Sequence, residues 1–145
     1  MENLLVSACL LGVDCKYNGG NNALPEETLE MLRRRYRLIP VCPETAGGLT
    51  IPREPSERRG ERVINRAGRD VTAEFRKGAE IAAALARRFK TRKALLKSNS
   101  PSCGSGSIYD GSFSGRLIAG DGMTSEYIKN EGVEVISDYS ILFQL

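Results

Sequence analysis

The stretch Leu4-Leu5-Val6-Ser7-Ala8-Cys9, near the start of the chain, decides the fold class. Continuous apolar runs of this length are typical of strands that are buried in a parallel sheet. A segment rich in Gly and Asn, residues 12–22, follows the run and predicts a turn region. We therefore expect the chain to open with a buried parallel strand whose last residue is Cys9.

Strands and helices alternate along the rest of the chain. Further strands are predicted at residues 37–42, 93–98 and 133–136. A helical pattern precedes each of them: one opens at Pro25 with Leu29, Leu32 and Tyr36 on its apolar face, one is capped by Asp70 and runs to Phe89, and one is capped by Thr124 and ends near Gly132. Residues 47–69 show no helical period and predict a long loop with a hairpin around Arg62–Asn65. The alternation predicts a three-layer α/β domain with a mainly parallel four-stranded sheet and a site at the carboxyl ends of its strands.

The composition narrows the chemistry that this domain can perform. The 145 residues suffice for one domain, and the net charge of +3 is too small to indicate nucleic-acid or membrane binding. The chain contains no histidine, which excludes histidine-based catalytic triads and His-containing zinc sites. Acid–base groups must therefore be carboxylates, Lys, Tyr or Cys. A soft-metal site must use the four cysteines, Cys9, Cys15, Cys42 and Cys103.

Nothing in the sequence predicts export or a membrane span. No apolar run reaches the length of about 18 residues that a bilayer requires, and Met1-Glu2-Asn3 lacks the basic region of a signal peptide. We therefore expect a cytoplasmic protein. Structural disulfides are rare in that compartment, so clustered cysteines there indicate metal or redox chemistry.

Three of the cysteines fall where parallel strands are predicted to end. Cys9 and Cys42 are the last residues of the first two strands, and Cys103 lies in the loop that follows the third. Because the ligand crevice of an open parallel sheet lies beyond these ends, we expect the thiols to form one site for an iron–sulfur cluster or zinc. Their spacing matches no ferredoxin, zinc ribbon or C-x-x-C redox motif. The alternative is that they are small buried hydrophobic residues.

Polar groups accompany two of these cysteines. Glu44 stands two residues after Cys42 and is a candidate for proton transfer, although a solvated loop glutamate is the simpler alternative. The segment around Cys103, residues 97–106, is rich in hydroxyl groups and glycine. Its amides and hydroxyls can hold an anion or donate hydrogen bonds to cluster sulfurs, whereas the simpler alternative is a plain turn.

Five segments of the chain form a distinctive set of motifs: Ser7-Ala8-Cys9-Leu10-Leu11-Gly12, Cys15-Lys16-Tyr17-Asn18-Gly19-Gly20, Val41-Cys42-Pro43-Glu44, Pro52-Arg53 and Leu96-Lys97-Ser98-Asn99-Ser100-Pro101-Ser102-Cys103-Gly104. Taken together, these motifs resemble the DUF523 family of bacterial proteins, which is associated with thiouracil desulfurases of the TudS type. The resemblance covers nearly the whole chain, so residues 1–145 are predicted to form a single domain of this family.

The resemblance implies a cofactor and a reaction. A [4Fe-4S] cluster would be held by Cys9, Cys42 and Cys103, and one iron would keep no protein ligand. That iron would take the sulfur of a thiolated uracil base or nucleotide, and water would complete the change from C=S to C=O. This change is a hydrolysis, so no electron donor is needed.

The resemblance also implies site residues. Catalytic roles fall to Glu44 and Ser100, with Ser98 or Ser102 as a further serine. Substrate contacts are expected from Lys16, Tyr17, Asn18, Gly19, Arg53, Lys97 and Ser102. Lys16 and Asn18 stand where Arg and Asp are commoner in the family, so the substrate preference can differ.

Cys15 leaves an alternative open. It can complete the cluster, which would close the open iron, or accept sulfur, or do neither, and we favour a position outside the ligand set. If all four thiols met at one point, the protein would instead be a non-enzymatic metal-binding module with zinc or an iron–sulfur cluster. A thiol redox protein is disfavoured by the cysteine spacing.

Overall fold

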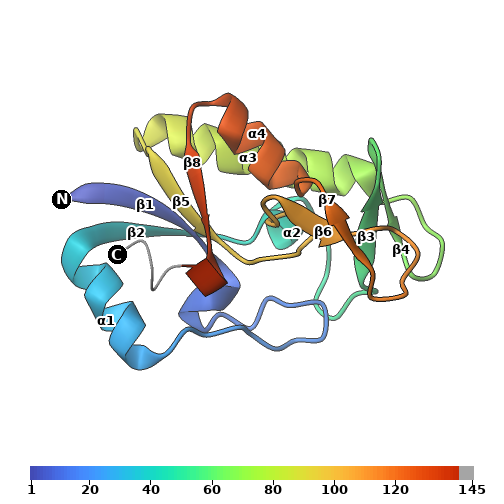
Figure 1. The fold of residues 1–145 in the computed structure, drawn as a ribbon, viewed down its shortest axis with the longest axis horizontal. Helices are drawn as coiled ribbons and strands as arrows, with labels where there is room; N and C mark the ends of the chain where they lie inside the picture. Colours follow the sequence, from blue (N-terminus) through green and yellow to red (C-terminus); the bar gives the residue numbers. More distant parts are fainter. Residues whose placement is uncertain (141–145) are drawn as a thin grey trace.

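The chain folds around a four-stranded parallel sheet, shown in a computed structural model that describes residues 1–140 (Figure 1). The last five positions of the predicted domain, 141–145, lie outside the described residues. The strand order is β2-β1-β5-β8, and Leu5 of β1 pairs with Ile39 on one side and Ala94 on the other. The strands are β1 (Glu2–Ser7), β2 (Tyr36–Val41), β5 (Lys93–Leu96) and β8 (Glu134–Ser137). The predicted α/β class and parallel sheet are confirmed.

Helices cover both faces of the sheet, which confirms the three-layer prediction. Helices α3 (Thr72–Arg88) and α4 (Met123–Asn130) lie on one face and α1 (Glu26–Arg35) on the other (Figure 1). Alternate residues of the strands supply the two cores, because successive side chains of a strand point to opposite faces. Leu5 packs with alanines of α3, whereas Leu4 packs with Leu32 of α1. The small side chains along α3 allow it to approach the sheet closely.

Short elements fill the connections. The predicted hairpin forms from β3 (Ser56–Arg59) and β4 (Arg62–Asn65). The elements that the sequence pattern did not predict are helix α2 (Pro43–Ala46), the hairpin of β6 (Ser107–Tyr109) and β7 (Leu117–Ala119), and the 3-10 helices η1 (Ala8–Leu11) and η2 (Asp138–Ser140). Within the described residues, none of the helices is both long and apolar enough to cross a membrane.

The structure corrects the predicted end of the first strand. Strand β1 stops at Ser7, and Cys9 lies in the 3-10 helix η1 instead of in the strand. Gly12, at a left-handed φ of 92°, ends this turn. Tyr36 is likewise not on the helix α1 that was predicted to include it, and is the first residue of β2.

The predicted helix caps are also corrected. Asp70 lies two residues before the first residue of α3, where its carboxylate accepts a hydrogen bond from the amide of Thr72 at 2.9 Å. Thr124 lies inside α4 and does not cap it. The first turn of this helix is capped by backbone carbonyls instead. The amides of Met123 and Thr124 donate to the carbonyls of Pro101 and Ser102, each at 2.9 Å. The N-terminus of α4 is thereby fixed to the loop that carries Cys103.

Candidate active site

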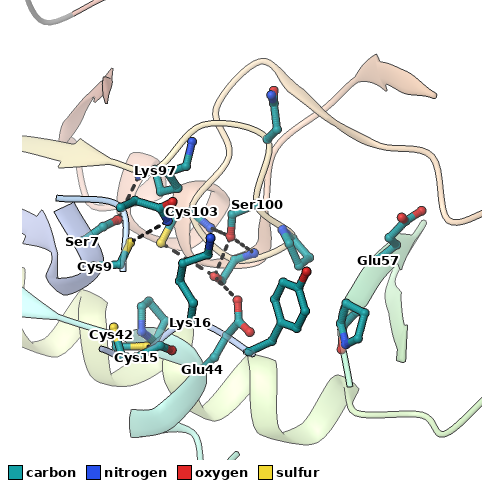
Figure 2. Close-up of a pocket in the computed structure, with 18 of the residues that line it drawn as sticks. Ser7, Cys9, Cys15, Lys16, Cys42, Glu44, Glu57, Lys97, Ser100 and Cys103 are labelled. Atoms are coloured by element: carbon teal, nitrogen blue, oxygen red, sulfur yellow. Dashed lines mark hydrogen bonds between the residues drawn. The ribbon is translucent and has the colours of Figure 1, made fainter. Parts of the chain in front are cut away.

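A pocket of about 480 Å³ opens where β1, β2 and β5 end, at the edge of the sheet where the sequence predicts the site. All four cysteines line it, although they come from four separate segments (Figure 2). Cys15 and Cys103 are buried, Cys9 and Cys42 are half-buried, and all are free thiols. The described structure therefore brings the three predicted cluster ligands and the uncertain fourth thiol to one cavity.

Burial raises the pKa of three of these thiols, those of Cys9, Cys15 and Cys103. It raises the pKa of Cys103 to about 12, and together with the neighbouring Cys42 it raises the pKa of Cys15 to about 12. Burial also raises the pKa of Cys9, against the hydrogen bond from Asn22. Without a metal these thiols are therefore protonated at neutral pH, and a bound soft metal must displace their protons.

The donor set fits an iron–sulfur cluster. Thiolates are the usual ligands of such clusters. Each thiolate binds a separate iron, so the cysteine sulfurs are spread around the cluster. A single ion requires its ligands to meet at one point. Among the residues that the structure describes, no three Cys, Asp or Glu side chains meet in that way.

Cys42 and Glu44 are positioned by a close contact between two helices. Cys42 occupies the N-cap position of α2, and Glu44 lies in its first turn. This short helix rests directly on the backbone of α3, since a Cβ atom built on Gly78 would lie 1.9 Å from the carbonyl oxygen of Pro43. Gly47 makes the reciprocal contact with the carbonyl of Glu74.

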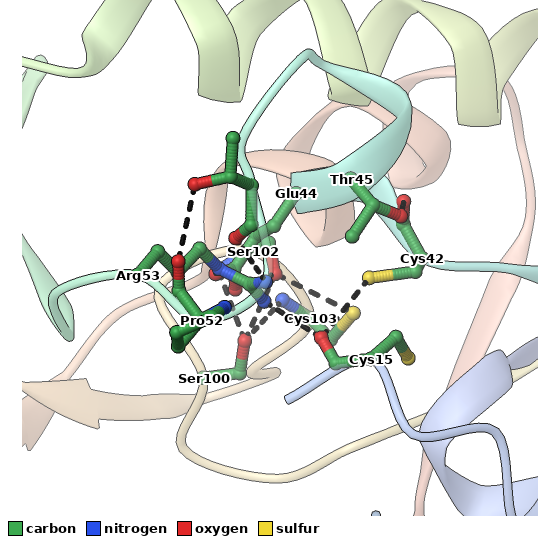
Figure 3. Close-up of polar contacts among 10 residues, drawn as sticks. Cys15, Cys42, Glu44, Thr45, Pro52, Arg53, Ser100, Ser102 and Cys103 are labelled. Carbon is green, nitrogen blue, oxygen red and sulfur yellow. Dashed lines mark hydrogen bonds and ion pairs between the residues drawn. The ribbon is translucent and has the colours of Figure 1, made fainter. Parts of the chain in front are cut away.

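A chain of hydroxyl groups connects Glu44 to the loop that carries Cys103 (Figure 3). The Ser102 hydroxyl donates to Glu44 Oε2 at 3.0 Å, and the Ser100 and Ser102 oxygens are 3.0 Å apart. The amides of Ser102 and Cys103 both donate to Ser100 Oγ, at 3.1 and 3.0 Å. Because the Ser102 proton points to the carboxylate, Ser100 is the donor between the two serines, and the chain can move a proton toward Glu44.

Arg53 contacts the other oxygen of the same carboxylate. Its Nε lies 3.1 Å from Glu44 Oε1, and its Nη2 donates to the carbonyl of Cys15 at 2.8 Å (Figure 3). A third bond runs from Nη1 to the carbonyl of Thr50 at 3.2 Å. The predicted substrate contact from Arg53 therefore belongs to a side chain that is already bound to protein groups.

Lys97 and Ser98 form a second polar group in the pocket. Lys97 Nζ lies 3.3 Å from Asp138 Oδ2 and 3.1 Å from Ser98 Oγ, and Asp138 Oδ1 accepts the amide of Ser98 at 2.7 Å. Ser98 itself is buried and is not part of the hydroxyl chain that ends at Glu44. Asp138 was not predicted, because it lies in η2, far from the other site residues in sequence.

The predicted substrate segment divides in two. Lys16 and Tyr17 line the pocket, whereas Asn18 and Gly19 are not among the residues that line it. Asn18 Oδ1 accepts the amide of Gly20 at 2.9 Å and so stabilises the turn. Asn22 was not predicted, yet it lines the pocket, and its side-chain Nδ2 lies 3.5 Å from Cys9 Sγ.

The far end of the pocket was also missed from the sequence. Glu57, Arg66, Tyr109 and Phe113 line it, and Arg66 lies 5.6 Å from the centre of the Phe113 ring. These residues come from the two hairpins and the loops beside them. No sequence signal singled them out, because their segments have neither a periodic pattern nor a motif.

Three comparisons relate this chain to known proteins. Residues 4–140 match a protein family described as 2-thiouracil desulfurase. The uncharacterized protein YbbK of Bacillus subtilis (strain 168) is 41% identical over 145 residues, which cover 93% of this chain and 95% of that protein. A solved structure of the [4Fe-4S]-dependent thiouracil desulfidase TudS superposes with a TM-score of 0.93 at 45% identity, covering 99% of this chain and 95% of the other.

Proposed function

This chain belongs to the 2-thiouracil desulfurase family, and from that premise we propose that it replaces the sulfur of a thiolated uracil by oxygen, with a [4Fe-4S] cluster as cofactor. The observation that carries the proposal is one pocket that combines thiols with a proton-transfer chain. The reaction consumes water and releases sulfide, so it needs no electron donor. The similarity to TudS over nearly the full length of both chains supports it.

We assign the cluster ligands to Cys9, Cys42 and Cys103, and place Cys15 outside the ligand set. When bound, the cluster supplies a thiophilic iron without a protein ligand, which polarises the C=S bond and accepts its sulfur. Thiols alone suit zinc as well as a cluster. The absence of a convergent single-ion site among the described residues, together with the similarity to a [4Fe-4S]-dependent enzyme, favours the cluster over zinc.

Glu44 is the group that we assign to proton transfer. The water that attacks the ring carbon must lose protons, and the departing sulfur must gain one. The hydroxyl of Ser102, with Ser100 behind it, conducts a proton to Glu44 Oε2 and back. The same serine lies 3.7 Å from Cys103 Sγ, which places this chain beside a proposed cluster ligand.

The substrate is a small molecule, either a thiolated uracil base or its nucleotide. Lys16, Tyr17, Lys97 and Ser98 line the pocket and are the proposed contacts, with Ser102 as a further one. A free base fills only part of about 480 Å³, and the far end near Arg66 offers a cation and an aromatic ring to a larger ligand. We propose a cytoplasmic location, because free buried thiols of this kind persist in a reducing compartment.

Anaerobic purification tests the cofactor and a substrate panel tests the reaction. We expect a brown protein with about four irons and four sulfides per chain, as the cluster formula requires. It should release sulfide from at least one of 2-thiouracil, 4-thiouracil and 4-thiouridine monophosphate. A colourless zinc protein that needs Cys15 as well as the other thiols would instead support a metal-binding module without this activity.

A further inference from the structure

Arg53 lies between the proton-transfer group and the loop that carries Cys15. Its side chain is only 8% exposed, and each of its three side-chain nitrogens has a protein acceptor. Nε contacts Glu44 and Nη2 contacts the carbonyl of Cys15 (Figure 3). Nη1 contacts the carbonyl of Thr50. A guanidinium that binds an anionic ligand would need nitrogens that are not already bound to protein groups, whereas those of Arg53 are.

We propose that Arg53 is a positioning residue, which fixes the carboxylate of Glu44 for proton transfer instead of binding a charged group of the substrate. The inference rests on the proposed function, because it concerns a residue of the same site. Arg53 thus acts on the reaction only through Glu44.

The geometry of the carboxylate supports this role. Arg53 holds Oε1 at 3.1 Å and Ser102 holds Oε2 at 3.0 Å, so the carboxylate is fixed at both oxygens. The terminal torsion of a glutamate has broad preferences and needs such partners to be fixed. No other hydrogen bond to this carboxylate is present among the described residues. Loss of Arg53 therefore frees the carboxylate to rotate about its bond to Ser102.

Arg53 also joins two segments of the chain at the pocket. Its backbone amide donates to the carbonyl of Tyr17 at 2.8 Å, and its Nη2 donates to the carbonyl of Cys15 at 2.8 Å. One residue thus fixes the loop at residues 12–22 at two points and orients Glu44 at a third. Only the planar fork of an arginine can bridge acceptors in these directions, since the ammonium of lysine is a single point.

Kinetics of the cluster-loaded enzyme separate positioning from anion binding. For Arg53→Lys and Arg53→Gln we expect kcat to fall about 100-fold, and any rise in KM to be the same for substrates with and without a phosphate. The fall should be the same for 2-thiouracil and for 4-thiouridine monophosphate, because the former has no phosphate. A rise in KM confined to the phosphorylated substrate, at unchanged kcat, would overturn the proposal.

A double-mutant cycle tests whether Arg53 acts through Glu44. Combining Arg53→Gln with Glu44→Gln should slow the enzyme no more than Glu44→Gln alone, because the positioned group is then already absent. Multiplied effects of the two substitutions would contradict the proposal. One active substrate suffices for this cycle.

Hydrogen exchange of the cluster-loaded protein gives a reading that does not depend on activity. We expect Arg53→Gln to exchange faster than the wild type in peptides that cover residues 12–22, at unchanged iron content. Arg62→Gln is the matched control, because Arg62 also pairs with a carboxylate but does not line the pocket. Unchanged exchange in Arg53→Gln would show that Arg53 does not anchor this loop, and would overturn the three-point contact on which the positioning of Glu44 depends. If the wild type released no sulfide from any substrate, the proposed function would fail while this reading still decided the placement of Arg53.

Discussion

At the scale of single residues, the site depends on how Glu44 is held. Its carboxylate receives the Ser102 hydroxyl on one oxygen and the Arg53 guanidinium on the other. The acceptor in both bonds is a charged carboxylate, and the Arg53 donor is charged as well, so these bonds are stronger than neutral ones. Because Glu44 lies beside the loop that carries Cys103, the pocket combines thiols with a proton acceptor, as a hydrolytic reaction requires.

The first prediction concerns Glu44 itself. Glu44→Gln preserves the shape of the side chain and its bond from Ser102 but removes the proton acceptor. We expect sulfide release to fall by a factor of about 100 or more, as for the loss of a general acid–base group. Iron content and visible absorption should match the wild type, and full activity in this variant would remove Glu44 from the mechanism.

The second prediction separates the four cysteines. Serine in place of Cys9, Cys42 or Cys103 should each abolish the cluster, because a hydroxyl is a poor ligand for iron in this setting. Cys15→Ser should retain about four irons per chain, as a residue outside the ligand set would. Iron and acid-labile sulfide analysis after anaerobic purification checks all four variants. Loss of the cluster in Cys15→Ser would instead place this thiol among the ligands.

At the scale of elements, the site is built by backbone contacts of short segments. Helix α2 rests on α3 through Gly47 and Gly78, and α4 is capped by carbonyls of the Cys103 loop. Neither contact leaves a hydrophobic pattern in the sequence. This explains why α2 was missed and why Thr124 was wrongly predicted as a cap.

The third prediction tests the contact between α2 and α3. In an ordinary helix, Gly→Ala would stabilise by about 1 kcal/mol. At Gly78 the added Cβ would meet the Pro43 carbonyl oxygen at 1.9 Å, so the two helices must separate. We expect Gly78→Ala to lower the free energy of unfolding by about 1–3 kcal/mol, measured by urea denaturation. The adjacent exposed Lys77→Ala is the control, and a stabilised Gly78→Ala would refute this packing.

The fourth prediction concerns Asp70 at the start of α3. Hydrogen bonds from the hydroxyl and the amide of Thr72 lower the pKa of this carboxyl below its ordinary value of 3.8. The stabilisation by Asp70 is therefore complete above the ordinary pKa of 3.8, and it is lost as the pH falls through the lowered pKa of the folded protein. Asp70→Ala should lower Tm at pH 7, and the difference should vanish in strong acid. A difference in Tm that does not change with pH would contradict this origin.

At the scale of the whole molecule, the sequence pattern was sufficient to predict the architecture and the edge of the sheet at which the pocket opens. Apolar runs such as residues 4–6 and the alanine face of α3 indicate which side chains are buried, and they do lie in the core. The layers and the parallel sheet could therefore be predicted. The contacts of Asn22, Arg53 and Asp138 could not be predicted, because they join segments that are distant in sequence. Polar partners of this kind have no periodicity, and only the fold brings them together.

The central claim is that water replaces sulfur on the substrate without an electron donor. The most direct measurement incubates the cluster-loaded protein with 2-thiouracil, without reductant, in water enriched in heavy oxygen. We expect one sulfide per base converted and uracil that carries the heavy oxygen, detected by mass spectrometry. If protein with a full cluster formed no oxygenated base from any thiolated substrate, or formed it only with an added reductant, hydrolysis at this site would be excluded.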